Sequence, residues 1–140
     1  MKKAILLFVL ITATIGAFAQ DEPKLPPDID MLKFFYTAYM APYFDGSQPT
    51  TLYRKQAVLR QVYCTPRGLA RYQQLMQESE DGDPFIKAQD SNPEAVKSLE
   101  ITRDPKQPNR YTVTYNPVNK VTIELSLITV NGKLMIDYLY

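Results

Sequence analysis

The hydrophobic period changes once along this chain, near Asn92-Pro93, and that change limits the fold more than any other feature. Before it, apolar residues recur three or four positions apart, as in helices that face a core. After it, apolar and polar residues alternate, as in strands with one buried face. Helices followed by strands predict an α+β domain, and strands with no helix between them predict an antiparallel sheet.

The strongest short-range signal in the second half is Asn131-Gly132, which lies between two alternating runs. A type I′ turn needs positive φ at both central residues, and Asn-Gly supplies it readily. One predicted hairpin face is apolar or aromatic and pairs Ile123 with Tyr140, Leu125 with Tyr138, and Leu127 with Ile136. The other face pairs Glu124 with Leu139, Ser126 with Asp137, and Ile128 with Met135. This register points Tyr138 into the domain and Asp137 away from its interior.

The first helix is predicted from Ile29 to Ala41, with Asp28 as its N-cap and Pro42 after its end. Its polar residues are spaced three and four apart and form one narrow stripe of Asp30, Lys33 and Thr37. Nearly all its other residues are apolar. We therefore expect the helix to be buried over most of its circumference.

Two further helices are predicted before the period changes. One runs from Leu52 to Tyr63 after the N-cap Thr50, and the next begins at Thr65-Pro66. Their inward residues are Leu52, Leu59, Val62 and Tyr63 in one helix, and Leu69, Tyr72, Leu75 and Met76 in the other. Arg54, Lys55, Arg60 and Gln61 are expected to point outward. The apolar positions that alternate along the strands are Leu99, Ile101, Tyr111, Val113, Tyr115, Val121, Ile123, Leu125 and Leu127.

The first residues have the pattern of an export signal. Met1-Lys2-Lys3 is basic, an apolar run from Ala4 to Ile15 follows, and Ala17-x-Ala19 is the small-residue pattern that a signal peptidase accepts. The alternative is an uncleaved N-terminal membrane anchor. We expect a signal peptide over residues 1–19, cleavage after Ala19, a flexible linker over 20–27, and a single α+β domain over 28–140. The protein is then periplasmic or secreted, with no membrane span after cleavage.

Composition excludes several classes of function. The chain has no histidine, so Ser-His-Asp and Cys-His catalysis and histidine-bound metals are ruled out. Of its 16 basic residues Lys2 and Lys3 leave with the signal peptide, which leaves 14 against 15 acidic residues. A nearly neutral mature chain argues against nucleic acid as a partner.

Cysteine and acidic residues suggest no cofactor and no metal. Cys64 is the single cysteine, so no intramolecular disulfide forms, and we expect a buried, inert thiol. Asp81, Asp83 and Asp90 lie close in sequence but lack the spacing of a calcium loop. They are better explained as a solvated helix end and as caps of turns.

Several short motifs together resemble a known family. They are Phe35-Tyr36 with Tyr39, Tyr63-Cys64-Thr65-Pro66, Asp83-Pro84-Phe85 with Ala88-Gln89-Asp90, and Asn131-Gly132 followed by Ile136-Asp137. With them the chain resembles the exported bacterial proteins of the domain of unknown function 3828 family. The resemblance implies a nuclear transport factor 2-like cone, in which helices pack into a strongly curved sheet, and an exported location. It implies no activity and no catalytic residue.

Ten tyrosines without a tryptophan are an unusual bias for a small domain. Tyr36, Tyr39, Tyr115 and Tyr138 are predicted to point toward the space between the first helix and the sheet. Aromatic rings with a few hydroxyls are typical of small-ligand sites, so these four are the candidate ligand-binding residues. The alternative is that the rings simply pack in the core.

The sequence thus favours a secreted, non-catalytic binding module that holds a small, partly apolar molecule in the mouth of the cone. An alternative is a periplasmic protein–protein interaction or inhibitor module, whose expected signature is an exposed apolar patch. Rings packed together without a void between them would favour this alternative. A less favoured alternative is an isomerase- or hydrolase-like enzyme that uses aspartate and tyrosine, with Asp137 the nearest carboxylate.

Overall fold

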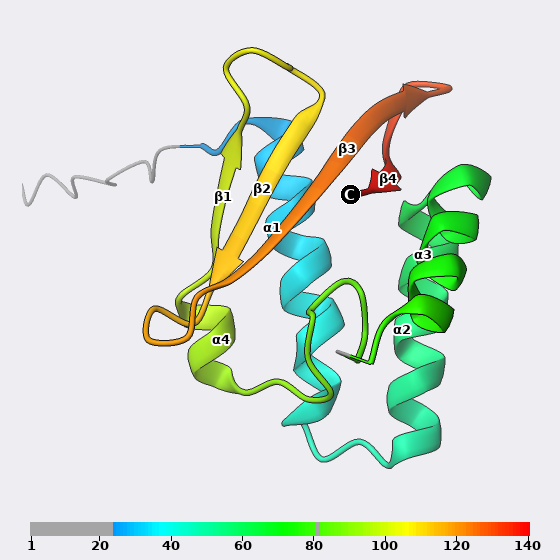
Figure 1. Cartoon of the computed structure of the whole chain (residues 1–140), viewed down its shortest axis with the longest axis vertical. Coiled ribbons are helices and arrows are strands. Elements are labelled where there is room, and N and C mark those ends of the chain that lie inside the picture. Colours follow the sequence, from blue (N-terminus) through cyan, green and yellow to red (C-terminus); the bar gives the residue numbers. More distant parts are fainter. Residues whose placement is uncertain (1–23, 81) are drawn as a thin grey trace, which may run out of the picture.

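Helices precede strands in the computed structural model, which describes residues 24–80 and 82–140 (Figure 1). The helices are α1 (Pro27–Met40), the short 3-10 helix η1 (Ala41–Tyr43), α2 (Pro49–Tyr63), α3 (Pro66–Glu78) and α4 (Pro93–Lys97). The predicted signal peptide, its cleavage site at Ala19, residues 20–23 of the predicted linker, and Asp81 lie outside the described residues.

The strands form one antiparallel meander, as the sequence predicts. They are β1 (Glu100–Arg103), β2 (Arg110–Tyr115), β3 (Val121–Val130) and β4 (Lys133–Leu139), in the sheet order β1-β2-β3-β4. Figure 1 shows the helices gathered against this sheet, with α2 and α3 beside β4. The domain is therefore α+β, with a sheet of four strands.

The Asn131-Gly132 turn has positive φ at both residues, and the predicted register is correct next to it. From Val130 opposite Lys133 to Leu127 opposite Ile136 the strands pair as expected. Between Ser126 and Leu127 a β-bulge shifts the register by one residue, so Ser126 lies opposite Tyr138 and Leu125 opposite Leu139. Beyond this bulge the predicted pairs are wrong. Leu139 is buried, and Tyr138 is only partly buried.

Packing of helix α3 against β4 depends on Gly68. A Cβ at this position would lie 2.6 Å from the carbonyl oxygen of Ile136, closer than real Cβ atoms come. Thr65 caps α3, as predicted, by accepting a hydrogen bond from the Gly68 amide at 3.0 Å. Its own amide donates to the Ile136 carbonyl at 2.9 Å, which ties the start of α3 to the edge of the sheet.

The core lies between α1 and the inner face of the sheet. Most of the alternating strand positions are buried, as predicted: Tyr111, Val113, Tyr115, Ile123, Leu125 and Leu127. Leu99, Ile101 and Val121 are only partly buried. Three apolar helix positions are exposed instead of buried: Phe34 in α1, Val62 in α2 and Met76 in α3. The prediction that α1 is buried over most of its circumference is therefore wrong on the side of Phe34.

Candidate functional site

A group of polar side chains lies among the helices, centred on Asp83. The Tyr39 hydroxyl donates to Asp83 Oδ2 at 2.7 Å, and the Tyr72 hydroxyl donates to the same oxygen at 3.0 Å. Arg60 Nη1 donates to the Tyr39 hydroxyl oxygen at 2.6 Å, and its guanidinium lies 4.4 Å from the centre of the Tyr72 ring. We call these four residues the Asp83 cluster. They join α1, α2, α3 and the turn that follows α3.

Asp83 also shapes its own turn. Its Oδ1 accepts the Phe85 amide at 2.8 Å, and its amide donates to the Ala88 carbonyl at 3.0 Å. The expectation that Asp83 caps a turn is correct, but it did not include the hydrogen bonds that Oδ2 accepts from Tyr39 and Tyr72. The next residue after Asp83-Pro84 is Phe85, which is fully buried. The cluster therefore fixes the turn that inserts Phe85 into the core.

Burial keeps the phenols of the cluster protonated. Burial and then the negative charge of Asp83 raise the pKa of Tyr39, although Arg60 acts in the opposite direction. The same two causes raise the pKa of Tyr72 to about 12. Phenols in this state donate hydrogen bonds to a carboxylate. The cluster thus acts as a set of directed hydrogen bonds that holds the fold.

Sequence reasoning missed two inward polar residues of α2. Arg60 was expected to point outward, yet it joins the Asp83 cluster. Gln56 is 1% exposed, and its Nε2 donates to the Tyr39 carbonyl at 3.1 Å. The signal is present in the sequence, because Leu52, Gln56, Leu59, Arg60 and Tyr63 have the spacing of one helix face. Position on the helix, and not residue type, decides which of these side chains point inward.

The space between the candidate tyrosines is occupied by Phe85. Its ring centre lies 5.3 Å from that of Tyr39, 6.4 Å from that of Tyr36 and 4.9 Å from that of Phe35. Tyr72 stacks on its other side at 5.5 Å. These distances are those of packed aromatic rings. The helix tyrosines thus belong to an aromatic core around Phe85.

The hydroxyls of Tyr115 and Tyr36 differ, because only that of Tyr115 has a hydrogen-bond partner in the described residues. The Tyr115 hydroxyl donates to the Ile86 carbonyl, so it also holds the turn after Asp83. The Tyr36 side chain is fully buried, and within the described residues its hydroxyl has no hydrogen-bond partner. Burial raises the pKa of Tyr36 well above its usual value, with a further contribution from Asp83.

Tyr138 lies apart from the other three candidates. The β-bulge turns it to the outer side of the sheet, where its ring centre is 5.1 Å from that of Tyr140. The guanidinium groups of Arg67 and Arg71 lie 4.7 Å and 5.3 Å from its ring centre. The four predicted rings therefore do not line one pocket, and the inward orientation of Tyr138 was wrong.

The same bulge buries Asp137, which was expected to point away from the interior. Its Oδ1 accepts the Thr65 hydroxyl at 2.8 Å, and its Oδ2 accepts Arg67 Nη1 at 2.7 Å. Both partners come from the start of α3, which packs on β4. This carboxylate therefore holds the helix to the strand.

Asp28 is likewise structural, and it is not the predicted N-cap. Pro26 holds that position, and Asp28 lies buried in the first turn of α1. Its Oδ2 accepts bonds from the Tyr111 hydroxyl and from Arg103, with Arg103 Nε at 3.0 Å. Burial alone would raise the pKa of Asp28, but the hydrogen bonds from Tyr111 and Arg103 outweigh it and lower that pKa.

Cys64 agrees with its expected role. The thiol is buried, and burial raises its pKa to about 12, although Arg60 acts in the opposite direction. Such a thiol carries little thiolate at neutral pH.

The outer side of the α1–α2 pair is apolar. Phe34 is 58% exposed, Val58 52% and Val62 41%. Beside them a groove of about 390 Å³ is lined by Ala38, Thr51, Arg54, Lys55, Val58 and Leu59. We call this groove, together with Phe34 and Val62, the α1–α2 face. Large apolar side chains at this exposure in one place are typical of a binding surface.

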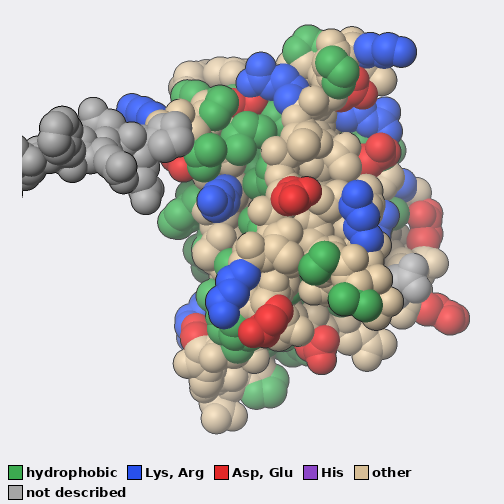
Figure 2. Space-filling model, turned by 90° about the vertical axis from the view of Figure 1, so that its left-hand side faces the viewer, with side chains coloured by type: hydrophobic (Ala, Val, Ile, Leu, Met, Phe, Trp, Pro, Cys, Tyr) green, Lys and Arg blue, Asp and Glu red, His purple; other side chains and the backbone are tan. Residues whose placement is uncertain are grey.

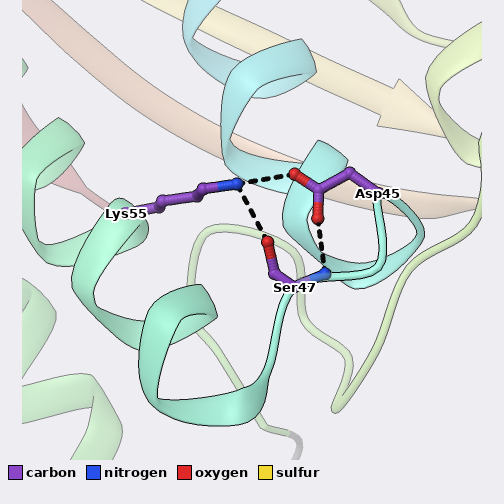
Figure 3. A network of polar contacts seen from close by, with 3 residues as sticks. All are labelled: Asp45, Ser47 and Lys55. Atoms are coloured by element: carbon purple, nitrogen blue, oxygen red, sulfur yellow. Dashed lines mark hydrogen bonds and ion pairs between the residues drawn. The ribbon is translucent and has the colours of Figure 1, made fainter.

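Two cations border this groove. Lys55 Nζ lies 2.7 Å from Asp45 Oδ2 and 2.9 Å from Ser47 Oγ, so it ties α2 to the loop after η1 (Figure 3). Arg54 is exposed and, within residues 24–80 and 82–140, its side chain has no ion-pair or hydrogen-bond partner. The groove therefore combines apolar walls with one uncompensated positive charge.

A second groove, of about 320 Å³, follows β1 and the start of α1. Leu25, Ile29, Leu99 and Ile101 form its apolar part, with Lys33 and Glu100 beside them. Figure 2 views the molecule from this side and shows basic and acidic side chains interspersed over the face, with hydrophobic ones gathered near the start of the described chain. Charges of both signs give this groove no preference for a partner of either charge.

Within residues 24–80 and 82–140 no three cysteine, aspartate or glutamate side chains are grouped closely enough to hold a metal ion. In the same part of the chain no helix is long and apolar enough to cross a membrane.

Comparison with known proteins gives one informative similarity. The chain resembles a crystal structure of a protein of unknown function from Bacteroides thetaiotaomicron, with a TM-score of 0.72 and 25% sequence identity. The match covers 81% of this chain and 88% of that one. No family model matches, and no curated protein matches. The similarity supports the α+β fold and carries no activity.

Proposed function

We propose that this protein is an exported, non-catalytic interaction module that binds a partner protein on the α1–α2 face. The observation that carries the proposal is the exposure of Phe34, Val58 and Val62 beside an apolar groove. A monomeric protein gains nothing in stability from apolar side chains left in water, whereas a partner that covers them removes that surface from water.

The interior offers less support for binding. The space that a ligand would need between Tyr36, Tyr39 and Tyr72 is taken by Phe85. The polar groups around it are bound to one another, as the contacts of Asp83 show. Rings packed in this way leave no room for a ligand inside, so they favour the interaction module over a hollow cone.

Export and family membership belong to the same proposal. The basic start, the apolar run and Ala17-x-Ala19 support cleavage after Ala19 and a periplasmic or secreted location. The motifs around Tyr39, Thr65-Pro66 and Asp83-Pro84-Phe85 support a relation to the domain of unknown function 3828 family. We infer a nuclear transport factor 2-like cone, with which helices packed on a four-stranded antiparallel sheet are compatible. Mass spectrometry of the exported protein tests the first point: its N-terminus is expected to be Gln20.

Site-specific photo-crosslinking tests the interaction itself. A photoreactive residue at Val58 is expected to give a crosslinked partner in the exporting cell, and Arg54→Glu in the same chain is expected to reduce the yield. Val118 is the matched control, because it is 93% exposed and lies in the β2–β3 turn. Equal adducts from both positions, or none from Val58, would contradict the proposal.

A second candidate function is the binding of a small, partly apolar ligand in the same groove rather than in the interior of the domain. A volume of about 390 Å³ lies at the lower end of the range for small-molecule sites. A thermal-shift screen against apolar metabolites and lipids tests it. A compound that raises the melting temperature of the wild type but not of Val58→Glu would favour this candidate over a protein partner.

A further inference from the structure

We infer that the partner presents an amphipathic helix to the α1–α2 face and sets a carboxylate against Arg54. This inference rests on the proposed function and names the chemistry of the partner. Three observations carry it: the shape of the groove, its length, and its charge.

The groove is shallow and open, and it runs between two helices. Ala38 lines it from α1, and Thr51, Val58 and Leu59 line it from α2. Phe34 lies beside its far end, where its ring centre is 6.1 Å from that of Tyr63. A shallow apolar groove between two helices is covered by the apolar face of a third helix in helix-in-groove recognition.

One side of α2 on this face is long enough to seat a short helix. Thr51, Lys55, Val58 and Val62 follow one another at intervals of four, three and four residues, so they lie on that side, and Val58 and Val62 are its apolar members. At a rise of about 1.5 Å per residue this side extends over roughly 16 Å, or about three turns. Three turns place apolar residues at i, i+3 or i+4, and i+7 of a partner helix over the groove.

The charge of the groove selects an acidic partner. Its lining residues include no carboxylate, and their charged members are Arg54 and Lys55. Asp45 already neutralises Lys55 at 2.7 Å, which leaves Arg54 available. Arginine binds a carboxylate through two parallel hydrogen bonds, so a glutamate or aspartate beside the apolar residues of the partner completes the site.

A second copy of this chain does not fit the same requirement. In a symmetric dimer the same face of both molecules would meet. Such a contact would bring Arg54 of one molecule to the side of the other that carries the same unpaired charge. The face therefore favours a different protein.

Three synthetic helical peptides of about 18 residues test the inference. They share one leucine stripe and carry glutamate, glutamine or lysine beside it. Fluorescence anisotropy gives their affinities, and amide chemical shifts of the labelled protein locate their site. The glutamate peptide is expected to bind at the α1–α2 face about three- to five-fold more tightly than the glutamine peptide, as for a solvent-exposed ion pair.

Charge reversal makes the test specific. Arg54→Glu is expected to invert the order, so that the lysine peptide binds most tightly. Lys106→Glu is the matched control, because Lys106 is exposed in the β1–β2 turn and the same change there is expected to leave the order unchanged.

The outcomes separate the two claims. If all three peptides bind the α1–α2 face equally and Arg54→Glu changes nothing, the inference fails while the proposed function stands. If none of the peptides shifts amides of this face, the proposed function fails with it. Binding of the glutamate peptide at another surface also overturns the inference.

Discussion

The inside of the helical layer contains a polar cluster, and its outside contains an apolar surface. Inside, the Asp83 cluster brings a carboxylate, a guanidinium and two phenols together among buried rings. Outside, on the α1–α2 face, Phe34, Val58 and Val62 stand in water. The polar groups of the Asp83 cluster have partners within the chain, whereas much of each apolar side chain on the α1–α2 face remains exposed to water.

This difference separates scaffold from binding surface. A buried polar group that has found its partners contributes to the stability and the shape of the fold. An exposed apolar side chain contributes little to stability, so its presence in a cluster needs another reason. We therefore expect changes inside to alter folding, and changes outside to alter binding without altering folding.

The largest effect is expected from Asp83→Ala. This change leaves the Tyr39 and Tyr72 hydroxyls without their acceptor and removes the bond that fixes the Phe85 amide. The cost in the free energy of unfolding should be about 3 kcal/mol, because buried donors are left unpaired. Urea unfolding followed by circular dichroism measures it. A loss no larger than that of an ordinary surface change would show that the cluster is not scaffold.

A smaller effect, with a pH dependence, is expected from Asp28→Asn. The neutral amide keeps an acceptor but loses the charge-assisted bonds with Arg103 and Tyr111, a cost of about 1.5 kcal/mol at neutral pH. Because the pKa of Asp28 in the folded state lies below its usual value of 3.8, its contribution is present above about pH 4. It is lost as the pH falls further.

Urea unfolding at several pH values follows this difference. The gap between wild type and Asp28→Asn should stay constant from pH 7 to about pH 4 and narrow as the pH falls further. Asp45→Asn is the control for a carboxylate at the surface, since Asp45 is exposed and its pair with Lys55 is screened by solvent. A gap that stays constant below about pH 4 as well would mean that the charge of Asp28 does not stabilise the fold.

Tyr39→Phe is expected to cost about 1 kcal/mol of unfolding free energy, the net value of a typical hydrogen bond. The ring keeps its contact with Phe85, and only the hydroxyl between Arg60 and Asp83 is removed. Binding at the α1–α2 face should not change. A variant with full stability and weakened binding would reverse the roles that we assign to inside and outside.

The sequence predicted the elements better than it predicted their faces. The Thr65 cap and the Asn131-Gly132 turn depend on neighbours in the chain, and both were predicted correctly. The short helix α4, which begins at Pro93, where alternation was expected to start, was not predicted. The bulge beside Leu127 was not predicted, because an alternating pattern assumes an unbroken ladder. The hydrogen bonds made at the bulge join distant parts of the chain, because Asp137 binds Thr65 and Arg67, which lie about 70 residues earlier.

The candidate site failed for a related reason. Tyr39 was correctly placed in the interior, but Phe85 belongs to a turn for which no periodicity exists, so its position in the core could not be predicted. Phe34 and Val62 were assigned to the core because they are apolar. Burial depends on which helix packs beside them, and a local pattern does not contain that information. The exposed face was therefore visible only in the folded chain.

The smallest effect on stability and the most direct test of the account come from the same variant, Val58→Glu. Val58 is half exposed, and glutamate is a better helix former than valine, so the free energy of unfolding should change by less than about 0.5 kcal/mol. The anionic apolar dye anilinonaphthalene sulfonate reports on the groove. Its fluorescence should rise with the native protein and with Val118→Glu, and it should not rise with Val58→Glu. A native protein that leaves the dye dark, or a Val58→Glu variant that binds it as the wild type does, would contradict the assignment of the α1–α2 face as the binding surface.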